Sequence, residues 1–232
     1  KFRSIAARAN YLAADLTDIM YAVKEICRGM AKPTEGDWKK LKRLGRYLLG
    51  NGRLTTHYSW QGDEESVTSF SDSDWAGCKV TAKSTSGGVV MVGPHFIKGW
   101  ARTQNHVTLS SAEAELIAPV KCTQECMGVQ SMLRDWGQDL TATLYADSSA
   151  ALAIAKRKGA GKLRHRNVSA LWIQDVQDRE GAEYTKILGS ENPADLMTKY
   201  LHKDRIVQHT IKLNQHRELG RAKSGLELQG AQ

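Results

Sequence analysis

Four acidic residues stand where strands are expected to end or helices to begin. Asp72 follows the β-prone run 67–71, and Asp147 follows the run 144–146. Glu115 falls in the first turns of a long helical pattern, and Asp195 falls in the first turn of a short one. Strand ends and helix starts can meet at one sheet edge. Converging carboxylates of this kind could hold two Mg²⁺ ions about 4 Å apart for phosphodiester hydrolysis, because hard cations prefer oxygen ligands.

Some of these acids also have a purely structural explanation. Asp147 precedes a Ser-Ser-Ala segment and could cap a helix. Asp195 lies just after Pro193, where an acid favours the helix dipole. The residues alone leave both interpretations open.

Neighbouring acids are expected to have supporting roles. Ser110 and Glu113 fit the S-x-x-E capping box, which turns Glu113 back onto the backbone. Glu115 lies about 200° further round the helix and is free to face elsewhere. Asp74 follows Asp72 by two positions, but the next three residues look like a turn. We therefore expect Asp74, Glu113 and Ser110 to support or shape the site.

A basic run follows the helix that begins after Asp147. Such runs are usually solvated surfaces, but its position also favours contacts with nucleic-acid phosphates. Its members are Lys156, Arg157, Lys158, Lys162, Arg164, His165 and Arg166.

The wider pattern predicts an α/β fold. Three strands in a meander and later β-α-β-like units indicate a mixed sheet with helices packed on it. Helices are predicted at 4–30 with a break near Asp15 and Asp18, and at 34–50, 111–136, 148–156, 168–179 and 193–199. Strands are predicted at 67–71, 87–92, 96–101, 144–146 and 184–188. Pro119 should disturb the first turns of the long helix.

The chain divides by character into three parts. A helical segment, 1–62, ends at a polar stretch around 61–65; an α/β domain covers 63–205, and a helical or frayed tail covers 206–232. The 232 residues carry a net charge of +8 and lack an initiator Met, which suggests a piece of a longer polypeptide. The longest apolar run, 89–92, is far short of the roughly 20 residues of a membrane span.

The cysteines indicate a reducing compartment. The four cysteines form no CxxC pair and lack the density of a secreted disulfide scaffold. Cys122 and Cys126 are four apart, but no histidine lies nearby to complete a zinc site. They are expected to be buried thiols.

Five segments carry a family resemblance. In order and spacing they resemble the ribonuclease H domain of copia-type LTR retrotransposon polyproteins, and residues 11–48 are similar to the end of the preceding reverse transcriptase region. The resemblance covers about residues 4–205. The five segments are 70–77, 84–88, 109–116, 146–150 and 193–199.

The resemblance implies a fold, a site and a reaction. It implies a ribonuclease H-like five-stranded sheet in which Asp72, Glu115, Asp147 and Asp195 bind two Mg²⁺ ions, with Mn²⁺ as a substitute. It also implies cleavage of the RNA strand of RNA–DNA hybrids. It further implies that residues 1–62 are the end of a reverse transcriptase and do not include its polymerase acids. The implied partners are the hybrid and the upstream reverse transcriptase domains, in the cytoplasm (as a virus-like particle) or in the nucleus.

The sequence departs from the family at its histidines. Relatives carry a Lys-His-Ile-Asp stretch and a second histidine, where this chain has Arg164-His165-Arg166-Asn167 and Leu171. Cellular ribonucleases H have a histidine just before the last acid, and 189–192 contains none. Two alternatives therefore stay open: a decayed nucleic-acid-binding remnant, and a structural module whose acids only cap helices.

Overall fold

The computed structural model describes residues 1–157, 167–180 and 182–220. Four short elements open the chain: helix α1 (Phe2–Leu12), the 3₁₀ turn η1 (Thr17–Ile19), α2 (Met20–Cys27) and α3 (Glu35–Gly50). The predicted break between the first two helices is present. Thr34 caps α3, because its hydroxyl accepts a hydrogen bond from the backbone of Asp37 while the Asp37 carboxylate accepts one from the Thr34 backbone.

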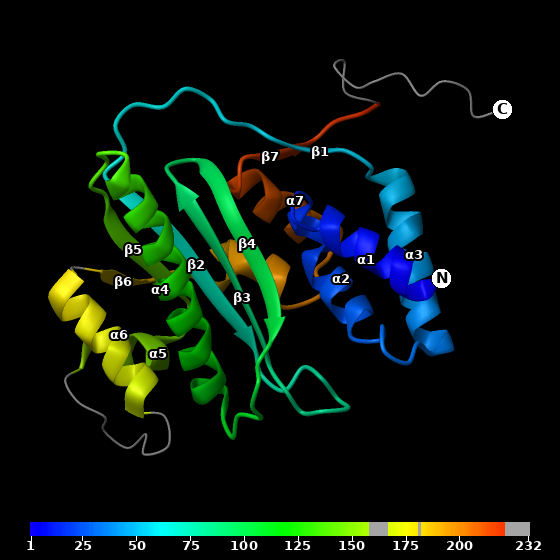
Figure 1. Ribbon diagram of the computed structural model, residues 1–232, viewed down its shortest axis with the longest axis horizontal. Helices are drawn as coiled ribbons and strands as arrows, with labels where there is room; N and C mark the ends of the chain where they lie inside the picture. Colours follow the sequence, from blue (N-terminus) through cyan, green and yellow to red (C-terminus); the bar gives the residue numbers. More distant parts are fainter. Residues whose placement is uncertain (158–166, 181, 221–232) are drawn as a thin grey trace.

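A five-stranded mixed sheet forms the centre of the molecule (Figure 1). Its strands are β2 (Ser66–Asp74), β3 (Thr85–Val92), β4 (His95–Thr103), β5 (Thr141–Ala146) and β6 (Glu183–Lys186), in the spatial order β4-β3-β2-β5-β6. The meander β2-β3-β4 is antiparallel, whereas β5 pairs parallel with both β2 and β6. This arrangement confirms the predicted mixed five-stranded sheet flanked by helices.

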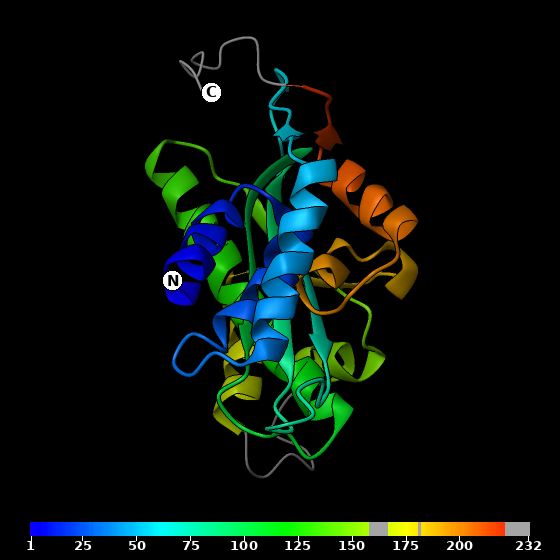
Figure 2. The ribbon, with the colours of Figure 1, turned by 90° about the vertical axis from the view of Figure 1, so that its right-hand side faces the viewer.

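Helices cover both faces of the sheet. On one face lie α4 (Ser111–Asp135), α5 (Ser149–Lys156) and α6 (Asn167–Glu180), whose apolar side chains share one core with β2 and β5. On the other face, Met20 of α2 packs with Val89, Phe96 and Met197 in a second core. A third core joins α1, α2 and α3, which stand in front of the sheet in Figure 2.

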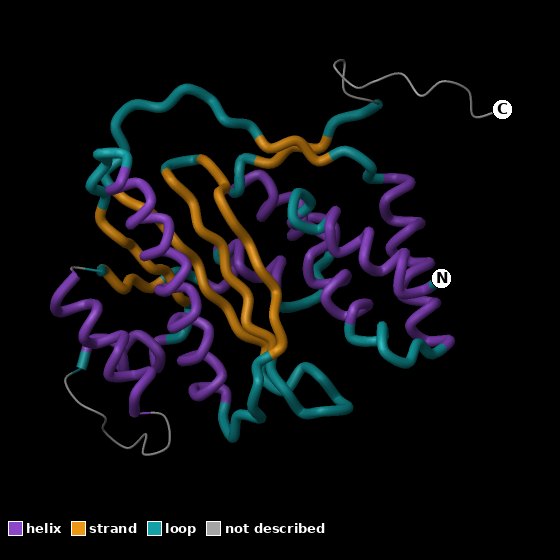
Figure 3. The backbone as a smooth tube through the Cα atoms, in the orientation of Figure 1, coloured by secondary structure: helices purple, strands orange, loops and turns teal. Residues whose placement is uncertain are grey.

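The end of the chain returns to its beginning. After β6 come the 3₁₀ turns η2 (Gly189–Glu191) and η3 (Pro193–Met197), then α7 (Lys203–Lys212) and β7 (Gln215–Arg217). Strand β7 pairs antiparallel with β1 (Leu54–Thr56), and this two-stranded ribbon lies apart from the main sheet in Figure 3. Most of the described part of the predicted tail, up to residue 217, is thus helix or strand, while 221–232 lie outside the described residues.

Three predicted details were wrong. Strand β2 runs two residues past Asp72, because Asp74 still pairs with Thr85 of β3. Helix α4 is continuous through Pro119, whose buried ring is part of the packed surface and offsets the missing hydrogen bond. The last predicted helix is a 3₁₀ turn that ends at Met197. No described helix is long and apolar enough to cross a membrane.

Candidate active site

Asp72 and Asp147 stand side by side at one edge of the sheet. Strands β2 and β5 are parallel, and their last register pair is Ser71 with Ala146. Each acid follows its member of that pair by one residue, so Asp147 lies just after the carboxyl end of β5 and Asp72 lies two residues before the carboxyl end of the adjacent β2. Asp72 is only 6% exposed.

Asp195 is held against this edge by the turn η3. Asn192 caps η3 by accepting a hydrogen bond from the backbone of Ala194 at 3.1 Å, and its side-chain amide donates one to the Ser71 carbonyl at 2.9 Å. The amide therefore fastens η3 to the end of β2. Strand β3 leaves room for η3 because it has Gly87 here, where an added Cβ would lie 2.5 Å from the Met197 Cβ.

The residues after η3 contact the acids directly. The Thr198 hydroxyl donates a hydrogen bond to Asp72 Oδ2. Lys199 Nζ lies 2.8 Å from Asp195 Oδ1 and 3.6 Å from Asp72 Oδ2. No role for Lys199 was predicted from the sequence, although its spacing of four from Asp195 is a signal that could have indicated an ion pair.

Burial and mutual repulsion disturb the protonation of these carboxyls. Burial raises the pKa of Asp195 to about 6; the charges of Asp72 and Asp147 add to this effect and Lys199 opposes it. Burial also raises the pKa of Asp147, helped by the charges of Asp72 and Glu115. Burial alone would lower the pKa of Lys199, but the acids outweigh it and raise that pKa. The edge therefore holds concentrated negative charge with Lys199 as a cation inside it.

Glu115 approaches the same edge from the start of α4. Its carboxylate is near enough to Asp147 to act on the pKa of that residue, and it is partly exposed. Gly189 approaches from the other side, where a Cβ would lie 3.1 Å from Asp147 Oδ2. A side chain at 189 would therefore crowd Asp147.

Glu113 and Asp74 have the surroundings of supporting residues. The Glu113 backbone donates a hydrogen bond to Ser110 Oγ at 3.2 Å, and its carboxylate accepts one from the Leu109 backbone at 2.7 Å. The predicted cap at Ser110 is present, but the Glu113 carboxylate accepts its hydrogen bond from the backbone of Leu109 and not from that of Ser110. Asp74 lies on the same strand face as Asp72. Burial raises its pKa, Lys24 lowers it and the charge of Asp72 raises it further.

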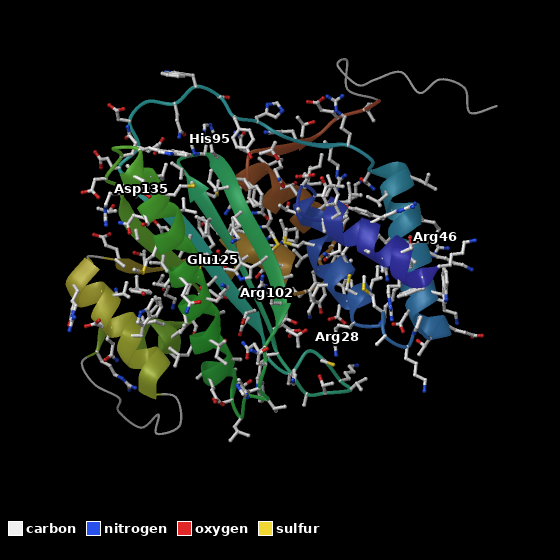
Figure 4. All side chains as sticks on the ribbon, viewed as in Figure 1. Arg28, Arg46, His95, Arg102, Glu125 and Asp135 are labelled. Atoms are coloured by element: carbon white, nitrogen blue, oxygen red, sulfur yellow. The ribbon has the colours of Figure 1, made fainter. Side chains whose placement is uncertain are left out.

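Helix α2 also reaches this edge, a contact that was not predicted from the sequence. Lys24 Nζ donates a hydrogen bond to Thr85 Oγ1 at 2.6 Å and pairs with Glu25 at 2.7 Å. Arg28, labelled in Figure 4 near the lower ends of the strands, donates to the Cys78 thiol. Side chains from the segment 1–62 thus border the carboxylates.

Most of the basic run lies outside the described residues. Lys156 is exposed at the end of α5, and Arg157 follows it with partial exposure. The predicted phosphate contacts of Lys158, Lys162, Arg164, His165 and Arg166 fall on residues that the structure does not describe.

The donor chemistry of the edge suits a hard cation. Carboxylate oxygens are the ligands that Mg²⁺ prefers, and Asp195 Oδ1 is buried with the Lys199 ion pair but no hydrogen bond from another described residue. Within residues 1–157, 167–180 and 182–220, however, no three His, Cys, Asp or Glu side chains are already arranged to hold a metal ion. The residues fit the ion by type, while Lys199 lies among them.

The pair Cys122 and Cys126 is not such a site. Both thiols are buried in the core and donate to the carbonyls of Phe70 and Val67, at 3.4 and 3.5 Å. They are buried thiols, as predicted.

Comparison with known proteins places the chain among retroelement polyproteins. No family model matches it. It is 30% identical over 204 residues to the retrovirus-related Pol polyprotein from transposon RE1 of Arabidopsis thaliana, covering 87% of this chain and 14% of the polyprotein. It is 28% identical over 190 residues to that from transposon TNT 1-94 of Nicotiana tabacum, covering 81% of this chain and 14% of the polyprotein.

Among solved structures, the N-terminal RNase H domain of a Mycobacterium tuberculosis protein, fused to maltose-binding protein, aligns with a TM-score of 0.42. It is 15% identical and covers 63% of this chain and 97% of that one. The chain spans about one seventh of the Pol polyproteins that it matches. Over most of its length the chain is homologous to copia-type retrotransposon Pol polyproteins.

Proposed function

We propose that this chain carries the ribonuclease H activity of its polyprotein and hydrolyses the RNA strand of RNA–DNA hybrids with Mg²⁺. The observation that carries the proposal is the meeting of Asp72, Asp147 and Asp195 from two parallel strands and one 3₁₀ turn. Acids that only cap helices would have no reason to converge with Asp72. Burial raises the pKa of Asp195 to about 6, and the charges of Asp72 and Asp147 add to this effect. A nuclease can use that concentration of charge to bind cations.

The proposed roles follow from the contacts. Asp72, Asp147, Asp195 and Glu115 hold two Mg²⁺ ions, which when bound supply a polarised water and stabilise charge on the phosphate. Thr198 orients Asp72 through its hydrogen bond, and Asn192 keeps Asp195 in reach by tying η3 to β2.

The proposed substrate, an RNA–DNA hybrid, is inferred from the family and from the positive charge of the basic run. A ribonuclease H must recognise the RNA strand through its 2′-hydroxyls and the shape of the groove, so sequence-specific binding is not expected. The basic run 156–166 supplies phosphate contacts, and the upstream reverse transcriptase domains of the polyprotein present the hybrid.

A cleavage assay tests the proposal. The full chain is incubated with a hybrid labelled on its RNA strand, with Mg²⁺, with Mn²⁺ or with a chelator. We expect cleavage that needs the metal and is lost by at least a hundredfold in Asp147→Asn, because a lost metal ligand removes stabilisation of the transition state. Asp139→Asn is the control, since Asp139 is exposed and pairs only at the surface with Arg134.

A non-catalytic role is the second candidate. The lack of a preformed metal group among the described residues, and the missing histidines, favour a remnant that binds nucleic acid without cutting it. Binding of the hybrid without cleavage under any of these metal conditions would support the remnant and overturn the proposed activity.

A further inference from the structure

Lys199 takes the position of a counter-ion inside the carboxylate cluster. Its ammonium group bridges Asp195 at 2.8 Å and Asp72 at 3.6 Å, and the two acids are 5% and 6% exposed. The charge of Asp147 acts on Lys199 as well. One positive charge is therefore shared by two buried carboxylates, from β2 and η3, and is also close enough to interact with the partly exposed Asp147 that follows β5.

The lysine reaches this cluster from the surface. Its side chain is 45% exposed, while the acids that it contacts lie beneath it. Lysine is a strongly hydrated point charge on a flexible stem of four carbons, so it can leave for water without unpacking its neighbours. The described hydrogen bonds that position η3, from Asn192 and Thr198, do not involve Lys199.

A divalent cation would need the oxygens that Lys199 occupies. Mg²⁺ binds carboxylate oxygens at about 2.1 Å in a strict geometry, and a nearby ammonium group repels it. Asp195 Oδ1 is the oxygen closest to Lys199, and no other described residue donates a hydrogen bond to it.

We propose that Lys199 is an exchangeable counter-ion: its ammonium group holds Asp72 and Asp195 together before the metal arrives, and Mg²⁺ binds by displacing it. This inference rests on the proposed function, because it assumes that the cluster binds Mg²⁺. In it, Lys199 is a positioning residue that keeps the acids close and sets the metal concentration at which the site fills.

Calorimetric titration of the full chain with Mg²⁺, at constant ionic strength, tests the exchange. Lys199→Met keeps the length of the stem and removes the charge, so we expect Mg²⁺ to bind about three- to tenfold more tightly than to the parent. The metal-free variant should melt at a lower temperature and gain more from Mg²⁺. Lys203→Met, which changes an exposed lysine at the start of α7, should match the parent in both measurements.

The outcomes separate the two proposals. Parent binding with equal or weaker binding by Lys199→Met would overturn the exchange and leave the proposed function standing. Mg²⁺ binding by Lys199→Met but not by the parent would support the exchange, because it would mean that the ammonium group alone prevents the metal from binding. Binding by neither protein would overturn the proposed function and the exchange with it.

A second measurement uses the unaltered protein and does not depend on the folding of a variant. The chain is labelled briefly with an amine-reactive acetylating reagent, with and without saturating Mg²⁺, and modified lysines are quantified by mass spectrometry. Displacement predicts that modification of Lys199 rises several-fold with Mg²⁺, while that of Lys203 stays constant. If Mg²⁺ binds in the titration but leaves the modification of Lys199 unchanged or lower, the exchange is wrong.

Discussion

Arg217 and Asp18, which are 199 positions apart in the chain, form an ion pair that fastens the last strand to the first helices. The Asp18 side chain is 2% exposed, and the Tyr47 hydroxyl donates a hydrogen bond to the same carboxylate at 2.5 Å. The Arg217 guanidinium also lies over the Tyr47 ring, 5.4 Å from its centre. These three residues join α3, β7 and the turn before α2.

Loss of Arg217 should destabilise the protein, because it leaves the buried Asp18 carboxylate without its cation. We expect Arg217→Met to lower the free energy of unfolding by about 2–3 kcal/mol, less than for a fully buried pair since Arg217 is 23% exposed. Urea unfolding measures this. Adding Asp18→Asn should recover part of the loss, and Arg134→Met in an exposed pair should change little. Strictly additive single effects would show that the pair does not couple.

His209 should make the protein sensitive to acid. It is fully buried in α7, neither ring nitrogen has a hydrogen-bond partner among the described residues, and burial with nearby cations lowers its pKa from 6.5 to about 4. Between those pH values the unfolded chain binds the proton and the native chain does not. The contribution of His209 to stability is therefore complete above about pH 6.5 and is lost as the pH falls towards 4.

Urea midpoints at pH 7 and pH 5 for the parent and His209→Leu test this effect. The parent should lose more stability than the variant over this interval. The comparison must be made between proteins, because Asp195, with its raised pKa, gains stability on acidification and acts in the opposite direction. His202→Gln at an exposed position is the control. Equal losses in parent and variant would contradict the assignment.

Asn192 should couple stability to metal binding. Asn192→Ala leaves the Ser71 carbonyl and the Ala194 amide without their partner, which should cost about 1–3 kcal/mol. Because η3 also carries Asp195, the variant should bind Mg²⁺ more weakly in calorimetry. Ser190→Ala, at an exposed neighbouring position, should change neither quantity. Lower stability with unaltered Mg²⁺ affinity would show that the attachment of η3 to β2 does not affect metal binding.

The basic run should act through phosphates. Each phosphate contact releases counter-ions, so Arg164→Ala and Arg166→Ala should weaken hybrid binding for every sequence and flatten its dependence on salt. Cleavage at saturating hybrid should persist in both, whereas Asp147→Asn should lose cleavage and keep its affinity. Hybrid binding measured at two salt concentrations tests this prediction. An unchanged dependence of affinity on salt in both arginine variants would show that the run is an ordinary solvated surface.

Local patterns were enough to predict much of the fold. Ser110 caps its helix as predicted, and the apolar spacing located the first helices and the five strands. Such features depend on residues a few positions apart, so a single sequence contains them. The mixed character of the sheet was predicted from a meander followed by β-α-β-like units and from the family resemblance.

The remaining features depend on contacts between distant segments. Strands β1 and β7 have three residues each and no alternation that could mark them. The continuation of β2 to Asp74 is decided by its pairing with Thr85. Lys199 was overlooked because a long flexible side chain can point to solvent or to a partner, and only the position of Asp72 on another element decides between them.

The pairing of β1 with β7 has a consequence for biosynthesis. Thr56 and Gln215 share a hydrogen bond across 159 positions, so at 5–20 residues per second the ribosome needs about 8–32 s to make the second partner after the first. During that interval the sheet domain can fold before β7 and Arg217, the partners of β1 and Asp18, have been synthesised. A chain that ended at residue 202 would keep the four candidate acids but lack β7 and Arg217, so Asp18 would have no ion pair with the last strand.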